Sequence, residues 1–221
     1  NRRVIVYSSP YDIIPTSSLL LTRHFMDRLR EAQSDLRIQE LILGKINRCQ
    51  TYAEDYSNLT FEERFDLIRN DTYRFDVLPA PDDLLIFIDD ITITGSHQLV
   101  LERLIAEHNL ENDAIFHYFA ALTLEEINPR IEAKLNDHYV NSVERLAVVV
   151  LHPDCRLVTR TIKRILRLGQ QDFNTFIEAL GGQARVILTD IFHSAIRNKY
   201  NEKKEYNTNL FFIHEYISSE N

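Results

Sequence analysis

Residues 84–97 read Leu-Leu-Ile-Phe-Ile-Asp-Asp-Ile-Thr-Ile-Thr-Gly-Ser-His. The first five are continuously apolar, as expected of a central parallel strand covered on both faces, and the run stops at Asp89 and Asp90. Small and hydroxylated residues follow, and then apolar positions over 99–105 with helical spacing. The stretch therefore predicts a buried strand, a turn and a helix in immediate succession.

Elements of the same kinds alternate on both sides of this stretch. Strand-like runs occur at 4–7, 36–46, 84–88, 114–122 and 146–151, and helical patterns at 19–29, 99–105 and 127–135, the last after a capping box at 123–126. Strands that alternate with helices at this spacing imply βαβ crossovers. We therefore expect an α/β fold with a doubly wound, mostly parallel sheet.

Two regions depart from this alternation. A polar excursion at about 48–80 carries a capping box and a short helical pattern over 60–68, and loops of this length are uncommon unless they are functional. From Arg156 onward the pattern predicts helices at about 157–168, 171–180 and 184–199, a mobile loop at 201–209 and a final aromatic strand at 209–217. We expect an α/β core over 1–155, with the excursion as a flexible-loop insertion, and a helical C-terminal extension over 156–221.

Composition limits the classes of function. The 221 residues are 44% hydrophobic and 26% charged, as in ordinary globular proteins. A net charge of −8 disfavours nucleic acid as a partner. Cys49 and Cys155 have no CxxC partner, and no apolar run reaches the ~20 residues of a membrane span. A cytoplasmic location is expected; because the chain starts at Asn1 without Met, some preceding sequence is expected to be missing.

The residues after the central strand favour binding of a sugar phosphate. In open α/β sheets, ligands bind beyond the carboxyl ends of the strands, where Asp89 and Asp90 are expected. Amides at a helix N-terminus form an anion site, and a glycine such as Gly95 lets the backbone approach a phosphate. Carboxylates for hydroxyls or a metal would thus lie beside a phosphate cradle. The alternative without a function is a pair of solvated acids at the end of a strand. A phosphatase motif of the form DxDxT does not fit, because its second acid would stand at position 91, which is Ile91.

Residues 84–97 resemble the phosphoribosyl pyrophosphate (PRPP) motif of type I phosphoribosyltransferases. The resemblance implies that Asp89 and Asp90 are the catalytic acids, which hold the ribose hydroxyls and Mg²⁺. The turn that would bind the 5′-phosphate consists of Thr92, Ile93, Thr94, Gly95, Ser96 and His97. Ile93 replaces a hydroxylated or small residue of the family pattern, and His97 replaces Thr or Ser and brings a titratable group to the phosphate.

The layout of the chain resembles the same family. The segment after the first strand takes the place of the pyrophosphate loop, with Ser8, Ser9 and Tyr11 as candidate ligands, although it lacks the usual Gly or Lys. The alternative is a simple turn with Thr16 or Ser17 as the N-cap. The excursion at 48–80 corresponds to the flexible catalytic loop, and the C-terminal part to the hood over the acceptor. Within the family, the divergent ComF-like branches are the most similar.

The resemblance implies an Mg²⁺-dependent transferase that moves ribose 5-phosphate from PRPP to a nitrogen nucleophile of nucleobase type and releases pyrophosphate. Two alternatives remain: a PRPP- or nucleotide-sensing protein without turnover, and a sugar-phosphate enzyme that does not use PRPP. The expected partners are small molecules, with no membrane, and a homodimer is left open. The sequence does not name the acceptor.

Two further patterns have both a structural and a functional interpretation. The basic stripe is either a solvated helix face or a contact surface for an acidic partner or a phosphate; it consists of Arg156, Arg160, Lys163, Arg164 and Arg167. Among the aromatic residues at 116–119, Tyr118 is the best candidate to face a site, because it has a polar tip.

Overall fold

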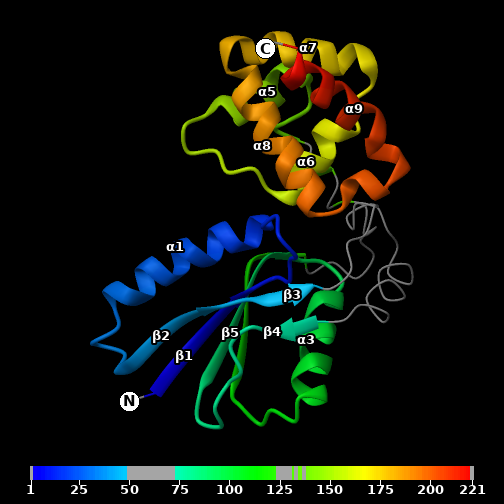
Figure 1. The fold of residues 1–221 in the computed structure, drawn as a ribbon. Helices are drawn as coiled ribbons and strands as arrows, with labels where there is room; N and C mark the ends of the chain where they lie inside the picture. The colour runs from blue at the N-terminus through cyan, green and yellow to red at the C-terminus, as the bar shows by residue number, and fades with distance from the viewer. Residues whose placement is uncertain (1, 49–72, 123–130, 132–133, 136–137, 220–221) are drawn as a thin grey trace. The chain divides into compact units, whose positions relative to one another are not determined.

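The computed structural model describes residues 2–48, 73–122, 131, 134–135 and 138–219 (Figure 1). In these ranges, no helix combines the length and the apolar composition that a membrane crossing requires.

The main sheet of the described residues is parallel throughout. Its strands are β1 (Arg2–Ser8), β2 (Ile38–Gly44), β5 (Leu84–Thr92) and β6 (Ala114–Ala121). Their order is β2-β1-β5-β6, so that β1 and β5, which are far apart in sequence, lie side by side. The expected α/β class with a mostly parallel sheet is confirmed.

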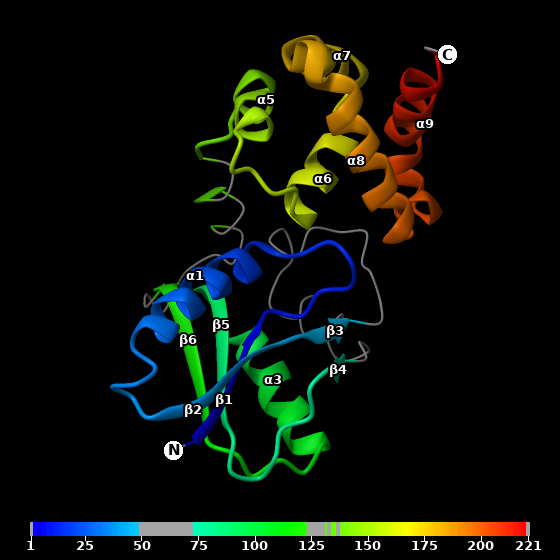
Figure 2. The ribbon, with the colours of Figure 1, turned by 60° about the vertical axis from the view of Figure 1, so that its left-hand side comes forward.

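Helices cover both faces of this sheet because the residues of β1 and β5 alternate between two cores. Val4 and Val6 pack with residues of α1 (Ser17–Glu31), including the buried Met26. Ile5 and Tyr7 point to the other face and share a core with Leu101 of α3 (Ser96–Glu107). Figure 2 shows α1 and α3 on opposite sides of the strands. Burial on both faces explains why these strands read as unbroken apolar runs.

A small antiparallel ribbon follows β2. It pairs β3 (Ile46–Arg48) with β4 (Tyr73–Phe75), and Tyr11 from the loop after β1 forms a further bridge to Asn47. The expected excursion lies between β3 and β4, so most of it, including the short helix predicted over 60–68, falls outside the described residues.

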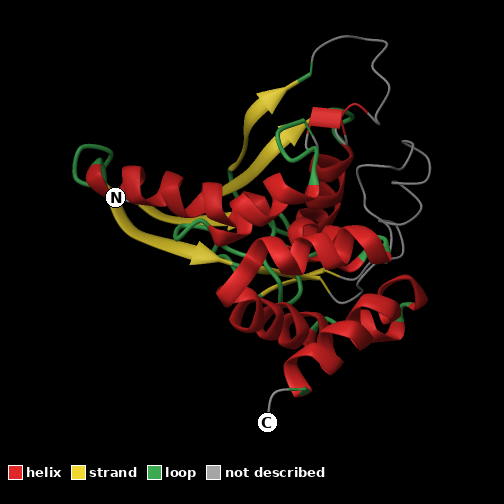
Figure 3. Ribbon diagram, turned by 90° about the horizontal axis from the view of Figure 1, so that it is seen from above, coloured by secondary structure: helices red, strands yellow, loops and turns green. Residues whose placement is uncertain are grey.

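The rest of the described chain is helical (Figure 3). Its α-helices are α5 (Val143–Leu151), α6 (Thr159–Leu166), α7 (Gln170–Leu180), α8 (Ala184–Arg197) and α9 (Lys204–Ser218), and its 3₁₀ turns are η2 (Gly181–Gln183) and η3 (Tyr200–Glu202). These helices share one core, in which Phe173, Phe176 and Leu188 are fully buried. The helices predicted at 157–168, 171–180 and 184–199 are confirmed.

The described residues fall into two compact units. The first holds the strands with α1 and α3, and the second holds α5 to α9 together with Ile13–Pro15 from the loop after β1. The helical unit thus includes α5, which precedes the boundary at 155/156 that the sequence suggested.

Two predicted strands are wrong. Residues 146–151 lie in α5, where Leu146, Ala147 and Val150 are buried and Val148 is 64% exposed. Ser142 accepts a hydrogen bond from the Arg145 N–H and so caps this helix. A short apolar run has no periodicity of its own, so its length and β-branched content favoured a strand.

The predicted aromatic strand at 209–217 lies in α9. Tyr206, Asn209, Leu210 and Ile213 are buried at a spacing of three and four residues, which is one face of a helix. The expected mobile loop at 201–209 is occupied by η3 and the first turns of α9. The helix predicted over 127–135 lies mostly outside the described residues.

Candidate ligand site at the carboxyl end of the sheet

The acidic pair lies where two adjacent parallel strands end. Asp89 and Asp90 are near the carboxyl end of β5, and Ser8, the last residue of β1, pairs with Ile88. Asp89 is only 9% exposed, whereas Asp90 is half-buried. The strand–turn–helix expected from the sequence thus places the two acids in unlike environments.

Both oxygens of Asp89 accept hydrogen bonds from the protein. Oδ1 accepts from Ser9 Oγ at 2.6 Å and from the Asp90 N–H at 2.9 Å, and Oδ2 lies 2.7 Å from His97 Nδ1. Burial alone would raise the pKa of Asp89, but His97 and the hydrogen bonds lower it below its ordinary value. An ionised carboxylate cannot donate, so Nδ1 of His97 carries the shared hydrogen.

Asp90 is bound by the first turn of α1. Its Oδ2 accepts from Ser17 Oγ at 2.9 Å, and its Oδ1 accepts from the Ile91 N–H at 2.8 Å. Sequence reasoning considered Ser17 only as an N-cap, and the cap is Thr16. The one signal for Ser17 was the run of three hydroxylated residues, Thr16 to Ser18, at the start of a helix.

The turn after the acids leads into α3, whose first-turn amides could hold an anion. Gly95 adopts φ 71° and is the N-cap of α3, so the amides of the first turn, which begin with Ser96 and His97, have no acceptor within the helix. The Ser96 N–H contacts Thr94 Oγ1 at 3.5 Å. Thr94 Oγ1 and Ser96 Oγ lie 2.7 Å apart and hydrogen-bond each other. Thr92, Ile93 and the other turn residues are half-buried, except Ser96, which is buried. The structure thus brings together the turn residues that the sequence predicted to bind phosphate.

The serine side chains at the start of the loop after β1 form hydrogen bonds with other protein groups. Ser8 is buried and its Oγ donates to the Ser9 carbonyl at 3.2 Å, while Ser9 Oγ donates to Asp89 and the Ser9 N–H donates to Ser18 Oγ at 3.2 Å. Two of the three residues predicted to contact pyrophosphate therefore already have partners within the protein. A ligand here would meet mostly backbone.

Lys45 supplies a cation that the first loop itself lacks. It directly follows β2, its Nζ donates to the Asp12 carbonyl, and Nζ lies 4.5 Å from the centroid of the Tyr11 ring. Tyr11, the third predicted pyrophosphate residue, thus presents its ring to Lys45. Sequence reasoning missed Lys45, although a basic residue directly after a parallel strand was a usable signal.

Tyr118 lies opposite Asp89 in the β5–β6 ladder. Its hydroxyl donates to Gln98 Oε1 at 3.1 Å, and burial together with the Asp89 charge raises its pKa to about 12. Phe116 stacks on Phe87 with ring centroids 5.1 Å apart and belongs to the core. Of the aromatic residues in β6, Tyr118 is therefore the one whose polar atom lies on the α3 face near the acidic pair.

The described residues contain no group of three or more His, Cys, Asp and Glu side chains arranged to hold a metal. Mg²⁺ is commonly held by one or two carboxylates with the remaining oxygens from phosphates and water. The donor set at the end of β5 fits an ion that arrives with a phosphorylated ligand.

Three residues of the basic stripe contact other residues of the helical unit. Lys163 is 8% exposed, with Nζ 5.7 Å from the Tyr200 ring centroid, and Arg167 pairs with Glu205 at 2.9 Å. Arg164 donates to the Val140 carbonyl. The stripe is therefore not a wholly solvated face, because Lys163 is buried and both Arg164 and Arg167 bind other residues of the helical unit.

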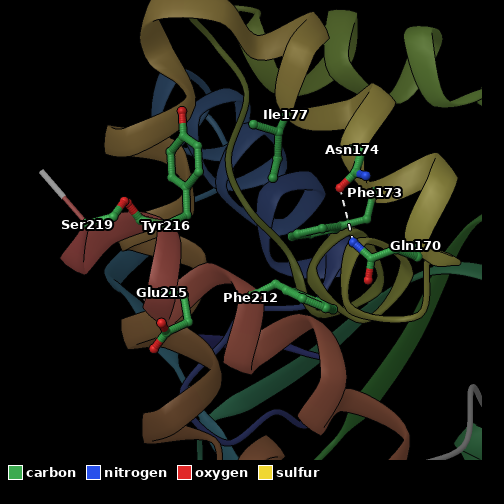
Figure 4. A pocket seen from close by; sticks show the side chains of 8 residues that line it. All are labelled: Gln170, Phe173, Asn174, Ile177, Phe212, Glu215, Tyr216 and Ser219. Carbon is green, nitrogen blue, oxygen red and sulfur yellow. Dashed lines mark hydrogen bonds between the residues drawn. The ribbon is translucent and has the colours of Figure 1, made fainter.

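A pocket of about 300 Å³ lies between α7 and α9 (Figure 4). Phe173, Ile177 and Phe212 supply apolar walls, and the amides of Gln170 and Asn174 hydrogen-bond each other at 3.1 Å. The lining has no arrangement of nucleophile, acid and base, so the acidic pair and its turn remain the best candidate site.

Comparison with known proteins gives one family. The family model described as PRTase ComF-like matches residues 1–213. A search of the curated proteins found no match.

Proposed function

The chain belongs to the ComF-like family of phosphoribosyltransferases, and we propose that it binds PRPP with Mg²⁺ at the end of β5. The observation that carries the proposal is the sequence of Asp89, Asp90 and the Gly95 turn that opens α3, which joins carboxylates to a helix-terminal anion site. Such a site matches a molecule that carries hydroxyls and a phosphate close together.

The proposed reaction transfers ribose 5-phosphate to a nitrogen nucleophile of nucleobase type. A bond forms between the nitrogen and C1′, the bond from C1′ to the pyrophosphate oxygen breaks, its electron pair leaves with pyrophosphate, and the nitrogen's proton passes to water. Bound Mg²⁺ would neutralise the pyrophosphate. The acidic pair would form the sugar end of the site, and the turn at Thr92–His97 would hold the 5′-phosphate, so the rate would come mainly from positioning and charge.

Lys45 supports the pyrophosphate end of this proposal. It brings a positive charge to the carboxyl end of β2, beside the loop that begins at Ser9. Because Ser8 and Ser9 donate their hydroxyls to protein groups, we propose that Lys45 and backbone amides bind the pyrophosphate, with Tyr11 holding the ammonium group.

A second candidate function is PRPP sensing without turnover. Asp89 already accepts hydrogen bonds from His97 and Ser9, and Ile93 places an apolar side chain in the phosphate turn. Asp89 is thus already held by protein groups and is less available to a reacting sugar, which favours binding without turnover. Release of pyrophosphate across a nucleobase panel separates the two functions.

Thermal unfolding with ligand tests PRPP binding in either case. PRPP with Mg²⁺ is expected to raise the melting temperature more than ribose 5-phosphate, and adenosine hardly at all; a ligand at 100 times its dissociation constant stabilises by about 2.7 kcal/mol. No shift at millimolar PRPP would overturn the proposal. Equal shifts by unrelated phosphates would indicate a generic anion site, and a shift by ribose 5-phosphate alone an enzyme that does not use PRPP.

Paired variants locate the binding. Asp89→Asn with Asp90→Asn is expected to abolish the PRPP shift while the circular dichroism spectrum is retained. The matched control replaces two exposed acids of the same unit, Asp27→Asn with Asp35→Asn, and should keep the shift.

A further inference from the structure

The two acids at the end of β5 differ in how accessible they are to a ligand. Asp89 accepts three hydrogen bonds on two oxygens and is 9% exposed. Asp90, whose contacts include the Ile91 amide and the Ser17 hydroxyl, is half-buried. A sugar hydroxyl that bound Asp89 would have to displace Ser9 or His97. A shared role for both acids is therefore hard to reconcile with this geometry.

His97 is placed where the bound phosphate would lie. It is the second residue of α3, within the first turn that follows Gly95, and its side chain is 43% exposed. Because Nδ1 is directed at Asp89, Nε2 on the opposite edge of the ring points away from the carboxylate. Amides of the helix N-terminus and an imidazole edge thus belong to one short segment.

We propose that Asp89 is a positioning residue, which orients His97 so that Nε2 binds the phosphate, while Asp90 binds the sugar hydroxyls. The identity of the sugar phosphate rests on the proposed function. When the ring carries both protons, Nε2–H donates to a phosphate oxygen and Nδ1–H to Asp89. The positively charged imidazole ring then lies between the Asp89 carboxylate and the phosphate, so it reduces the repulsion between these two anions.

Inorganic phosphate separates this role from direct sugar binding, because it carries no sugar hydroxyl that a carboxylate could bind. Binding of inorganic phosphate and of ribose 5-phosphate to the full chain would be measured by calorimetry. Asp89→Ala is expected to weaken both by the same factor, about tenfold. Removal of a nearby anion should by itself strengthen phosphate binding, so a loss points to His97. Asp90→Asn should weaken ribose 5-phosphate alone.

Asp89→Asn is the conservative rescue. Its amide oxygen can accept from His97 Nδ1 while its NH₂ group donates to Ser9 Oγ, so the ring stays oriented, although the hydrogen bond from the Asp90 N–H is lost. We expect phosphate affinity within about threefold of the wild type. If Asp89→Ala instead leaves inorganic phosphate unchanged and weakens only ribose 5-phosphate, Asp89 is a sugar ligand and the proposal is wrong.

Two substitutions of His97 test the same geometry from the other side. His97→Asn places a donor where Nδ1 lies but has nothing at Nε2, and should weaken phosphate about tenfold; His97→Gln reaches toward the Nε2 position and should weaken it less. Asp89→Ala combined with His97→Asn should be no weaker than either alone, because both remove one interaction. Additive losses would contradict the proposal. His24→Asn, at an exposed histidine of α1, is the control.

Nitrogen NMR of the histidine ring gives a readout that general destabilisation would not change. The His97 Nδ1–H signal should be present in the wild type and in Asp89→Asn, and absent in Asp89→Ala variants that remain folded. If phosphate binds as described but PRPP with Mg²⁺ gives no stabilisation, the proposed function fails and the role of Asp89 stands. If PRPP binds strongly but Asp89→Ala leaves the phosphate affinity unaffected, the role of Asp89 fails and the proposed function stands.

Discussion

Gly44 shows how a single position in a strand depends on its neighbour. It is buried at the end of β2 opposite Tyr7 in β1, and a Cβ at Gly44 would lie 2.3 Å from Cε1 of the Tyr7 ring. Tyr7 is fully buried, and its hydroxyl donates to the Val77 carbonyl at 2.7 Å. The ring therefore cannot move aside, and β1 and β2 would have to separate.

We expect Gly44→Ala to destabilise the protein by about 1–3 kcal/mol, as overpacking of a well-filled core does. Thermal or denaturant unfolding measures the change. Gly182→Ala is the matched control, because a Cβ there would meet nothing within 4 Å among the described residues, and its effect should stay within about 0.5 kcal/mol. Equal stability of the two variants would show that the Tyr7 ring has room to shift.

At the scale of elements, an ion pair joins the starts of two parallel strands. Asp83 directly precedes β5. Arg3 in β1 donates from Nε to Asp83 Oδ1 at 2.8 Å and from Nη2 to Oδ2 at 2.5 Å. Asp83 is 3% exposed, and its Oδ2 also accepts from the Ala80 N–H at 2.7 Å. The hydrogen bond from Arg3, outweighing burial, lowers the pKa of Asp83 below its ordinary value.

This lowered pKa predicts the direction of a pH dependence. The unfolded chain binds a proton at Asp83 near pH ~3.9, whereas the folded chain does so only at lower pH. The stabilisation is therefore complete above the unfolded value and is lost as pH falls through the folded pKa. Asp83→Asn should lower the melting temperature at pH 7 by several degrees, and the difference from the wild type should vanish toward pH ~2. A difference that persists unchanged in acid would mean that the charge of Asp83 contributes nothing.

The elements themselves differ in how well the sequence predicted them. β1 and β5 were predictable because burial on both faces leaves an unbroken apolar run between polar loops. In α5 and α9, aromatic and β-branched residues favour strands locally, whereas packing selects a helix that buries one face. In α9 the spacing of Tyr206, Leu210 and Ile213 was visible in the sequence, but the polar stretch before it concealed the start of the helix.

At the scale of the whole molecule, the loop after β1 belongs to both units. Ser9 hydrogen-bonds Asp89 in the first unit, whereas Ile14 is 4% exposed in the core of the helical unit. The Ile14 N–H donates to Asn198 Oδ1 at 3.2 Å, and its carbonyl accepts from Thr159 Oγ1 at 3.1 Å. One loop therefore contributes Ser9 to the candidate site and, further along the chain, Ile14 to the core of the helical unit.

Asn198→Ala tests this arrangement. Asn198 is 2% exposed, so its loss leaves the buried Ile14 N–H without an acceptor, and we expect a destabilisation of about 1–3 kcal/mol in the unfolding of the helical unit. Protection of the Ile14 amide against hydrogen exchange should fall in the same variant. Asn201→Ala, at an exposed position, is the control. Unchanged Ile14 protection would show that the loop is held by other contacts.

The sequence by itself determined the α/β class, the strand–turn–helix at 84–97 and the acids and hydroxyls that carry the proposed chemistry. These are local properties: apolar runs, turn-forming residues and charges that follow one another along the chain. Tertiary structure alone decided that His97 and Ser9 bind Asp89, that Ser17 binds Asp90, that Lys45 lies over Tyr11, and that Ile14 packs in the helical core. Each of these contacts, apart from the one between His97 and Asp89, joins residues far apart in the sequence, and even that one depends on the turn at Gly95. Such pairings follow from strand order and packing, which composition and spacing do not encode.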